Sequence, residues 1–165
     1  MELVVLSGLS GSGKTTALRA LEDGGYLCVD NLPVALLETF LRLAEDSSSV
    51  TRVAVVMDIR EMSFGADVAR QLDELKAKGQ AIRLVYFDAN DDRLITRFKE
   101  TRRKHPLIAM GEAETVSEAI ALERSWLQPI RVRASTVIDS SELTVHDLKR
   151  RTRVMFVEAE ERELT

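Results

Sequence analysis

The sequence is poor in cysteine and has neither an excess of basic residues nor a long apolar run. Cys28 is the single cysteine of the 165 residues, which excludes an internal disulfide and a cysteine-based zinc site. No run of about 18 uncharged apolar residues is present that could cross a bilayer. The first residues, MELVVLSG, lack the basic region and the cleavage site of a secretory signal. We therefore expect a cytoplasmic protein that makes no use of a membrane.

The charge balance of the chain is acidic. The 23 Lys and Arg residues are outnumbered by 27 Asp and Glu residues, which gives a net charge of −4. Nonspecific binding to nucleic acid depends on neutralising phosphates, so we do not expect this chain to wrap RNA or DNA over its whole surface. A local basic patch stays open. The length suits one well-packed core, and residues 1–165 are expected to form one domain.

Apolar, β-branched runs alternate with segments of helical period along the whole chain. Runs of this kind, apolar at nearly every position, are typical of strands buried on both faces of a parallel sheet. The alternation itself predicts right-handed β-α-β crossovers. The expected strands are residues 3–7, 26–30, 52–59, 82–89 and 135–140, and the expected helices are 14–22, 33–44, 64–78, 91–104, 116–131 and 145 to about 161.

A glycine-rich stretch between the first strand and the first helix fits the pattern G-x-x-x-x-G-K-[ST] of the P-loop. Glycines let the backbone curl around phosphates, and the amides at the start of a helix attract the anion. Lys14 is expected to reach the β and γ phosphates of ATP or GTP, and Thr15 to ligate Mg²⁺. The predicted nucleotide-binding residues of this motif are Gly8, Leu9, Ser10, Gly11, Ser12, Gly13, Lys14 and Thr15.

Two acidic residues follow predicted strands. Asp58 comes at the end of RVAVVMDIR, where a Walker B carboxylate would join Thr15 as a ligand of Mg²⁺, although it could also be an ordinary strand-end carboxylate. Asp30 ends the strand YLCVD, at the edge of the sheet where ligands gather. It could orient water, accept a proton from a phosphoryl acceptor or join the ligands of Mg²⁺, and equally it could cap the helix that begins near Pro33. Lys14, Asp30 and Asp58 are the candidate catalytic residues.

Basic residues gather in RFKETRRKHP, residues 97–106. This cluster, which includes Arg97 and the predicted nucleotide-binding residues Arg102 and Arg103, could close over the polyphosphate as a lid. Cations near a helix C-terminus are also favourable without any ligand. His105 has no visible nucleophile partner, and we do not assign it as a base. A five-stranded P-loop sheet with an acidic residue after the second strand and an arginine-rich lid resembles nucleoside monophosphate and shikimate-type kinases. The expected fold is therefore an α/β P-loop NTPase, nucleoside-kinase-like, with a five-stranded parallel sheet and helices on both faces.

Four stretches together resemble a known family: GLSGSGKTTALRALEDGGYLCVDNLP, DIR, TRRKHPL and VIDSSELTVHDLKRR. They are similar to the amino-terminal domain of the RapZ family of nucleotide-binding RNase adapter proteins, also described as YvcJ-type P-loop proteins. The resemblance implies binding of ATP and GTP with weak ATPase or GTPase activity at most. It also implies a second nucleotide-binding element, marked for GTP, at Asp58-Ile59-Arg60-Glu61.

Members of that family continue into a second, carboxy-terminal domain, to which RNA and amino-sugar phosphate binding are attributed in the enterobacterial branch. This chain corresponds to the amino-terminal half, and RNA and RNase partners are expected only through the other half. The resemblance favours a regulatory nucleotide-binding module. A small-molecule or nucleotide kinase that uses Asp30 near its acceptor, and a plain NTPase, stay as alternatives. A homo-oligomer is compatible with the sequence, which does not give the number of copies.

Overall fold

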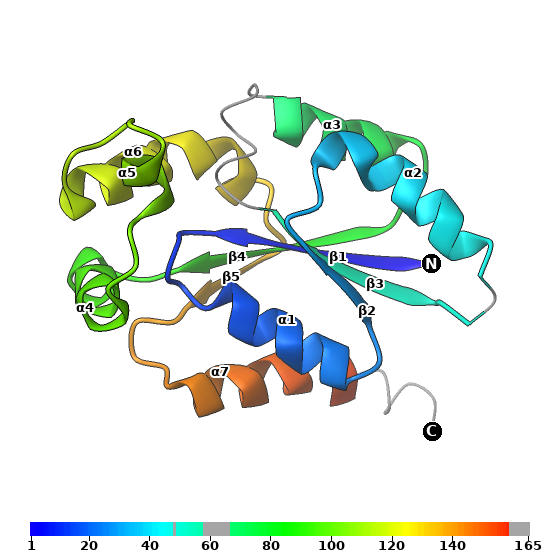
Figure 1. Cartoon of the computed structure of the whole chain (residues 1–165). Coiled ribbons are helices and arrows are strands. Elements are labelled where there is room, and N and C mark those ends of the chain that lie inside the picture. The colour runs from blue at the N-terminus through cyan, green and yellow to red at the C-terminus, as the bar shows by residue number, and fades with distance from the viewer. Residues whose placement is uncertain (48, 58–66, 159–165) are drawn as a thin grey trace.

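The computed structural model describes residues 1–47, 49–57 and 67–158. Its centre is a parallel sheet of five strands in the order β2-β3-β1-β4-β5, shown in Figure 1. This arrangement confirms the expected five-stranded parallel sheet. The strands are β1 (Glu2–Gly8), β2 (Leu27–Asp30), β3 (Arg52–Val56), β4 (Ile82–Asp88) and β5 (Thr136–Asp139).

The central strand β1 pairs with β3 on one side and with β4 on the other. Leu3, Val4, Val5 and Leu6 are fully buried because helices cover both faces of the sheet. The register aligns Leu6 with Val56 of β3, and these pairings bring the carboxyl ends of the central strands to one edge. Loops that leave this edge are where an open α/β sheet holds a ligand.

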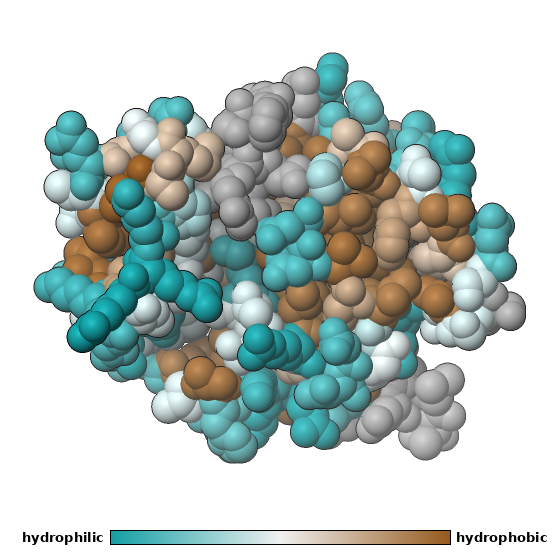
Figure 2. Space-filling view, viewed as in Figure 1, coloured by the Kyte–Doolittle hydropathy of each residue, from teal (hydrophilic) through white to brown (hydrophobic). Residues whose placement is uncertain are grey.

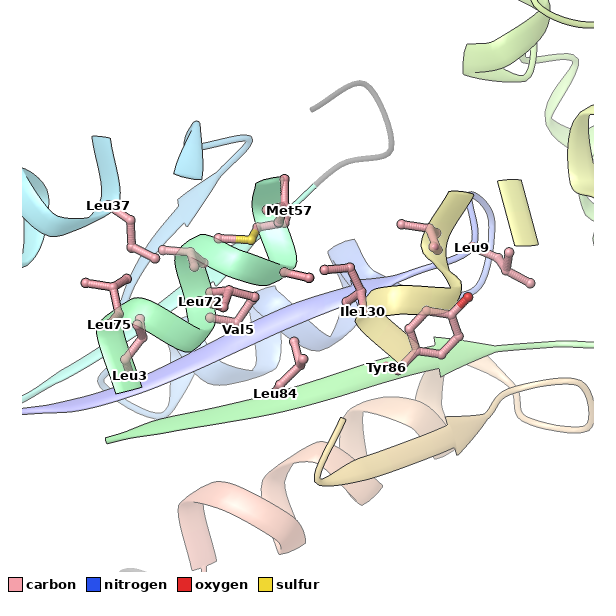
Figure 3. Close-up of a cluster of buried hydrophobic side chains, with 14 of the residues drawn as sticks. Leu3, Val5, Leu9, Leu37, Met57, Leu72, Leu75, Leu84, Tyr86 and Ile130 are labelled. Atoms are coloured by element: carbon pink, nitrogen blue, oxygen red, sulfur yellow. The ribbon is translucent and has the colours of Figure 1, made fainter. Parts of the chain in front are cut away.

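Helices lie on both faces of the sheet (Figure 1). One face carries α1 (Lys14–Asp23), α7 (Val145–Thr152) and the π-helix Arg153–Glu158. The other face carries α2 (Val34–Glu45), α3 (Asp67–Ala77) and α6 (Val116–Arg131). Figure 3 shows the second face, where Leu37, Leu72 and Ile130 pack over Val5 and Leu84. The helices α4 (Asp91–Thr101) and α5 (Pro106–Ala109) complete the fold near the carboxyl edge.

Two predicted helices differ from the structure. The helix expected over residues 91–104 ends at Thr101, because Arg102 adopts a left-handed conformation with φ 54°. A short helix, α5, follows and was not expected. The last predicted helix changes after Thr152 into the π-helix, which buries Phe156 and Val157 against the α1 side of the core.

The helices α7 and α2 begin in different ways. Thr144 caps α7 in a capping box with Asp147. The entry to α2 is different: Pro33 precedes the helix, and no side chain caps it. Among the described residues, no helix is both long enough and apolar enough to span a membrane.

Candidate functional site

The predicted phosphate-binding loop joins the carboxyl end of β1 to the start of α1, at the edge of the sheet where ligands are expected. Two of its glycines cannot be replaced without a clash. A Cβ atom on Gly8 would lie 2.2 Å from the carbonyl oxygen of Phe87, and one on Gly13 would lie 2.3 Å from Cδ2 of Leu148. Both glycines also have positive φ, 138° and 109°. The glycines of the motif therefore fix how tightly the loop curls against β4 and α7.

Lys14 is the first residue of α1 and bends back across the loop. Its Nζ atom donates hydrogen bonds to the carbonyl oxygens of Gly8 at 2.7 Å and Leu9 at 2.9 Å. Within the described part of the chain, the amides of Gly11, Gly13 and Thr15 donate no hydrogen bond. The first turn of α1 has no acidic residue, so the positive end of the helix is not neutralised there. Open amides beside an ammonium form an arrangement suited to a polyphosphate.

Arg97 of α4 holds the outer side of the loop. Its guanidinium donates to the Gly11 carbonyl oxygen at 2.9 Å and to the Ser140 carbonyl oxygen at 2.6 Å. The buried hydroxyl of Ser140 in turn donates to the Ser12 carbonyl oxygen at 2.6 Å. Partial burial, followed by repulsion from Arg93, lowers the pKa of Arg97. Arg97 therefore serves to fix the loop in its curled shape and is already engaged with the backbone.

Glu123 of α6 holds the inner side of the loop. Its side chain is fully buried, and its carboxylate accepts from the Ser10 amide at 2.8 Å and from the Ser10 hydroxyl at 2.6 Å. The ring nitrogen Nε2 of His105, which is also fully buried, lies 3.2 Å from Oε1 of the same carboxylate. Glu123 is not among the residues predicted from the sequence. The signal for it is a charged residue at a position in register with the apolar face of α6, where Ala119, Ile120 and Leu127 are buried.

The second predicted element, Asp58-Ile59-Arg60-Glu61, lies outside the described residues. The described part of β3 ends at Val56, and the amide of Met57 donates to the Leu6 carbonyl oxygen at 2.9 Å. Met57, the last described residue before Asp58, thus lies beside β1. The roles assigned to Asp58 as Walker B residue and Mg²⁺ ligand stay predictions.

Asp30 is the last residue of β2 and is exposed. It is level with Val56, which is level with Leu6, so it lies two strand spacings, about 10 Å, from β1. In the described part of the chain its carboxylate makes no hydrogen bond or ion pair, and no side chain caps α2. The capping role considered for Asp30 is therefore not found, and its carboxylate is available at the carboxyl edge of the sheet.

The basic segment, defined as residues 102–104, follows α4 as a short exposed loop. Arg102 is the C-cap residue, and Arg103 and Lys104 lie beyond the helix. Figure 2 shows long hydrophilic side chains where the chain passes from α4 to α5. Among the described residues, the side chains of Arg102 and Arg103 have no hydrogen-bond or ion-pair partner, and the contact to the loop comes from Arg97, which belongs to the same basic cluster. The lid role of Arg102 and Arg103 stays a prediction.

The described residues contain no group of three or more His, Cys, Asp or Glu side chains placed to hold a metal ion by themselves. A magnesium ion bound with a nucleotide does not need such a group, because phosphates and water supply most of its ligands. The exposed Thr15 in the first turn of α1 is a donor that fits this kind of ion.

Sequence comparison gives a consistent set of relatives. A family model described as the RapZ-like N-terminal domain matches residues 1–160. A "Nucleotide-binding protein" of Myxococcus xanthus (strain DK1622) is 48% identical over 155 residues, which cover 94% of this chain and 53% of the relative. A protein of the same name from Anaeromyxobacter sp. (strain K) is 47% identical over 160 residues, covering 96% of this chain and 54% of the relative. The chain thus spans about half the length of these relatives.

Solved structures that share the fold include kinases of small molecules. Shikimate kinase from Bacteroides thetaiotaomicron aligns with a TM-score of 0.60 at 13% identity and covers 93% of this chain and 97% of its own. A gluconokinase from Sinorhizobium meliloti 1021 aligns with a TM-score of 0.54 at 14% identity and covers 98% and 97%. At this level of identity the likeness establishes the fold, which is that of P-loop kinases as expected.

Proposed function

This chain belongs to the family of RapZ-like N-terminal domains, and from that premise we propose that it binds a nucleoside triphosphate with Mg²⁺ and acts as a regulatory module with slow turnover. Residues 8–15 bind the phosphates in this proposal. ATP and GTP are both ligands, with Asp58 to Glu61 contributing to the binding of GTP. Thr15 and Asp58 hold Mg²⁺, whose role is to neutralise phosphate charge.

The observation that carries the proposal is the geometry of the loop. The amides without a hydrogen bond, the unneutralised start of α1 and the Lys14 ammonium all lie in this short loop or where it enters α1. Lys14 at present donates to two loop carbonyl oxygens, and a phosphate oxygen would be a charged and therefore stronger acceptor. The names of the relatives, which are nucleotide-binding proteins, support the same class of ligand.

The regulatory part of the proposal rests on the relation of this chain to its longer relatives. Since the chain spans about half of their length, nucleotide occupancy here would be read by the other half, through which RNA and an RNase are engaged in the cytoplasm. This predicts that a full-length relative binds RNA and that the present chain does not. RNA retention by this chain alone in a mobility-shift assay at physiological salt would contradict that division of roles.

Isothermal titration of the chain with ATP and with GTP, each with Mg²⁺, tests the binding proposal. Charged hydrogen bonds contribute about 1.5–3 kcal/mol each, so Lys14→Ala should weaken nucleotide affinity by about 10- to 100-fold. Lys99→Ala is the matched control, because the Lys99 side chain is exposed and makes no hydrogen bond or ion pair with any described residue. Equal affinities of the two variants would refute the assignment of the loop.

A small-molecule kinase is the second candidate, and it is favoured by one observation. The Asp30 carboxylate is exposed at the carboxyl edge and has no partner among the described residues, as an acceptor-activating base would require. Turnover of ATP should be measured with a panel of nucleoside monophosphates and sugars. We expect no acceptor to raise it. An acceptor that raised the rate to about 1–1000 per second, and lost this effect in Asp30→Asn, would establish the kinase instead.

A further inference from the structure

We propose that Glu123 and His105 are positioning residues that couple the phosphate-binding loop to the basic segment at residues 102–104. The proposal rests on the proposed function in so far as nucleotide is the ligand that moves the loop. Glu123 bonds to the loop through Ser10 and not through the amides of Gly11, Gly13 or Thr15. Both act through Ser10, and the basic segment is attached directly to His105 along the chain.

The first link is between the loop and Glu123. The Ser10 amide donates to Oε1 and the Ser10 hydroxyl to Oε2, at 2.8 Å and 2.6 Å. Both contacts end on one carboxylate that is fully buried. A buried carboxylate has no water to replace a lost donor, so Glu123 has to follow Ser10 when the loop changes shape.

The second link is between Glu123 and His105. The amide of Leu107 donates to Nδ1 of His105 at 3.1 Å, which leaves the ring proton on Nε2, 3.2 Å from Oε1 of Glu123. The ring is thus oriented at both nitrogens, by the cap of α5 on one side and by the carboxylate on the other. Oε1 of Glu123 receives two N–H donors, one from the loop and one from His105, and it joins them directly.

An aromatic contact runs parallel to this chain of hydrogen bonds. The ring of Phe98 lies 5.1 Å from the ring of His105, centroid to centroid. The same Phe98 ring lies beside Gly11, where a Cβ atom would be 3.5 Å from its edge. The loop therefore reaches His105 by two routes, one polar through Ser10 and one apolar through Gly11.

The basic segment depends on these links for its position. Arg102, Arg103 and Lys104 are exposed, and in the described part of the chain their side chains have no hydrogen-bond partner. The segment is held at its start by the hydrogen bond from the Arg102 amide to the Phe98 carbonyl oxygen and at its end by His105. Nucleotide that orders the loop should therefore also restrain the segment. The positions of its positive charges would then differ between the nucleotide-free and the nucleotide-bound protein.

Two substitutions of His105 separate coupling from folding. In His105→Asn the side-chain oxygen can take the place of Nδ1 and keep the α5 cap, but nothing reaches Glu123. In His105→Gln the side-chain amide can take the place of Nε2 and keep the donor to Glu123, but the cap is lost. A merely structural role for His105 would make the two variants similar, whereas coupling requires the Gln variant to resemble the wild type.

The measurement is hydrogen exchange of the full chain with and without ATP and Mg²⁺, together with the rate of tryptic cleavage after residues 102–104. In the wild type and in His105→Gln, nucleotide should slow exchange at the loop and slow cleavage at the segment. In His105→Asn and Glu123→Leu, protection of the segment should disappear. Affinity should fall about fivefold in His105→Asn, the effect of one hydrogen bond, and by more in Glu123→Leu, which also removes both hydrogen bonds from Ser10. Glu123→Gln should restore coupling, because its amide oxygen can still accept from both the Ser10 amide and His105.

Two outcomes would overturn the proposal. One is bound nucleotide that protects the loop and leaves cleavage at residues 102–104 unchanged in the wild type. The other is equal behaviour of His105→Asn and His105→Gln. Failure of the binding proposal is a separate result, since calorimetry would then detect neither ATP nor GTP. In that case hydrogen exchange of the Ser10 amide, measured without ligand, still tests the coupling. The proposal then requires this amide to exchange faster in His105→Asn than in His105→Gln.

Discussion

Replacing Gly13 with alanine should lower the free energy of unfolding by about 2–6 kcal/mol, the sum of a backbone and a packing contribution. An L-residue at φ 109° is strained by about 1–3 kcal/mol. The new Cβ atom would lie 2.3 Å from Cδ2 of Leu148, far inside the carbon–carbon contact distance of about 3.5–4.0 Å. Leu148 is 4% exposed and packed in the α1 side of the core, so relieving the overlap costs about another 1–3 kcal/mol.

Gly79 offers a matched control for the backbone contribution. Its φ is 94°, and a Cβ atom there would meet nothing within 4 Å. Gly79→Ala should therefore lose only about 1–3 kcal/mol. Leu148→Ala alone should cost about 2–5 kcal/mol through loss of buried volume. The double variant Gly13→Ala, Leu148→Ala has no such overlap. Its loss in the free energy of unfolding should therefore be smaller than the sum of the two single losses by about 1–3 kcal/mol.

Urea unfolding followed by the fluorescence of Trp126, the single tryptophan, measures all four free energies. Trp126 is partly buried against the core, so its emission should change on unfolding. Equal losses in Gly13→Ala and Gly79→Ala, or additive losses in the double variant, would show that contact between the loop and α7 is not what requires glycine at residue 13.

Two further predictions concern Arg97 and Cys28. Arg97→Ala removes the hydrogen bonds to the carbonyl oxygens of Gly11 and Ser140 and should lower the free energy of unfolding in urea by about 1–3 kcal/mol. Arg93→Ala, at an exposed position, should change it little, and equal effects of the two substitutions would show that Arg97 does not fix the loop. Burial, and to a smaller extent the charge of Glu22, raises the pKa of Cys28 from 9.0 to about 11. Alkylation by iodoacetamide at pH 8 should therefore be about a hundredfold slower than for an ordinary thiol, and should approach the ordinary rate only above pH 11 or in urea. A fast reaction of the folded protein at pH 8 would rule this out.

The sheet and the phosphate-binding loop could be predicted because their signals are local. Apolar strands and the motif at residues 8–15 are each contained in a short stretch of sequence. The structure has strands in those runs and places the motif between a strand and a helix. The partners of the loop could not be predicted in the same way. Ser10 and Glu123 are 113 positions apart, and only the fold shows that they meet.

The break after Thr101 was missed for a different reason. The segment that follows has no glycine or asparagine to mark a left-handed residue, and Arg102 takes that conformation instead. Because α5 starts directly afterwards and His105 points into the core, the cationic run at residues 102–104 became a loop rather than the last turn of a helix. No role was predicted for His105, because the sequence shows no nucleophile that it could serve as a base. Its partners in the structure are the Leu107 amide and Glu123.

The placement of β1 at the centre of the sheet has a consequence for the order of folding. The loop after β1 is among the first segments to be synthesised, yet its supports come from Phe87, Arg97, Glu123, Ser140 and Leu148. Contacts of such high sequence separation form slowly and late. The loop cannot have all of these supports until about nine-tenths of the described chain has left the ribosome, so a ligand that requires the fully supported loop would bind after this domain has folded rather than to an early intermediate.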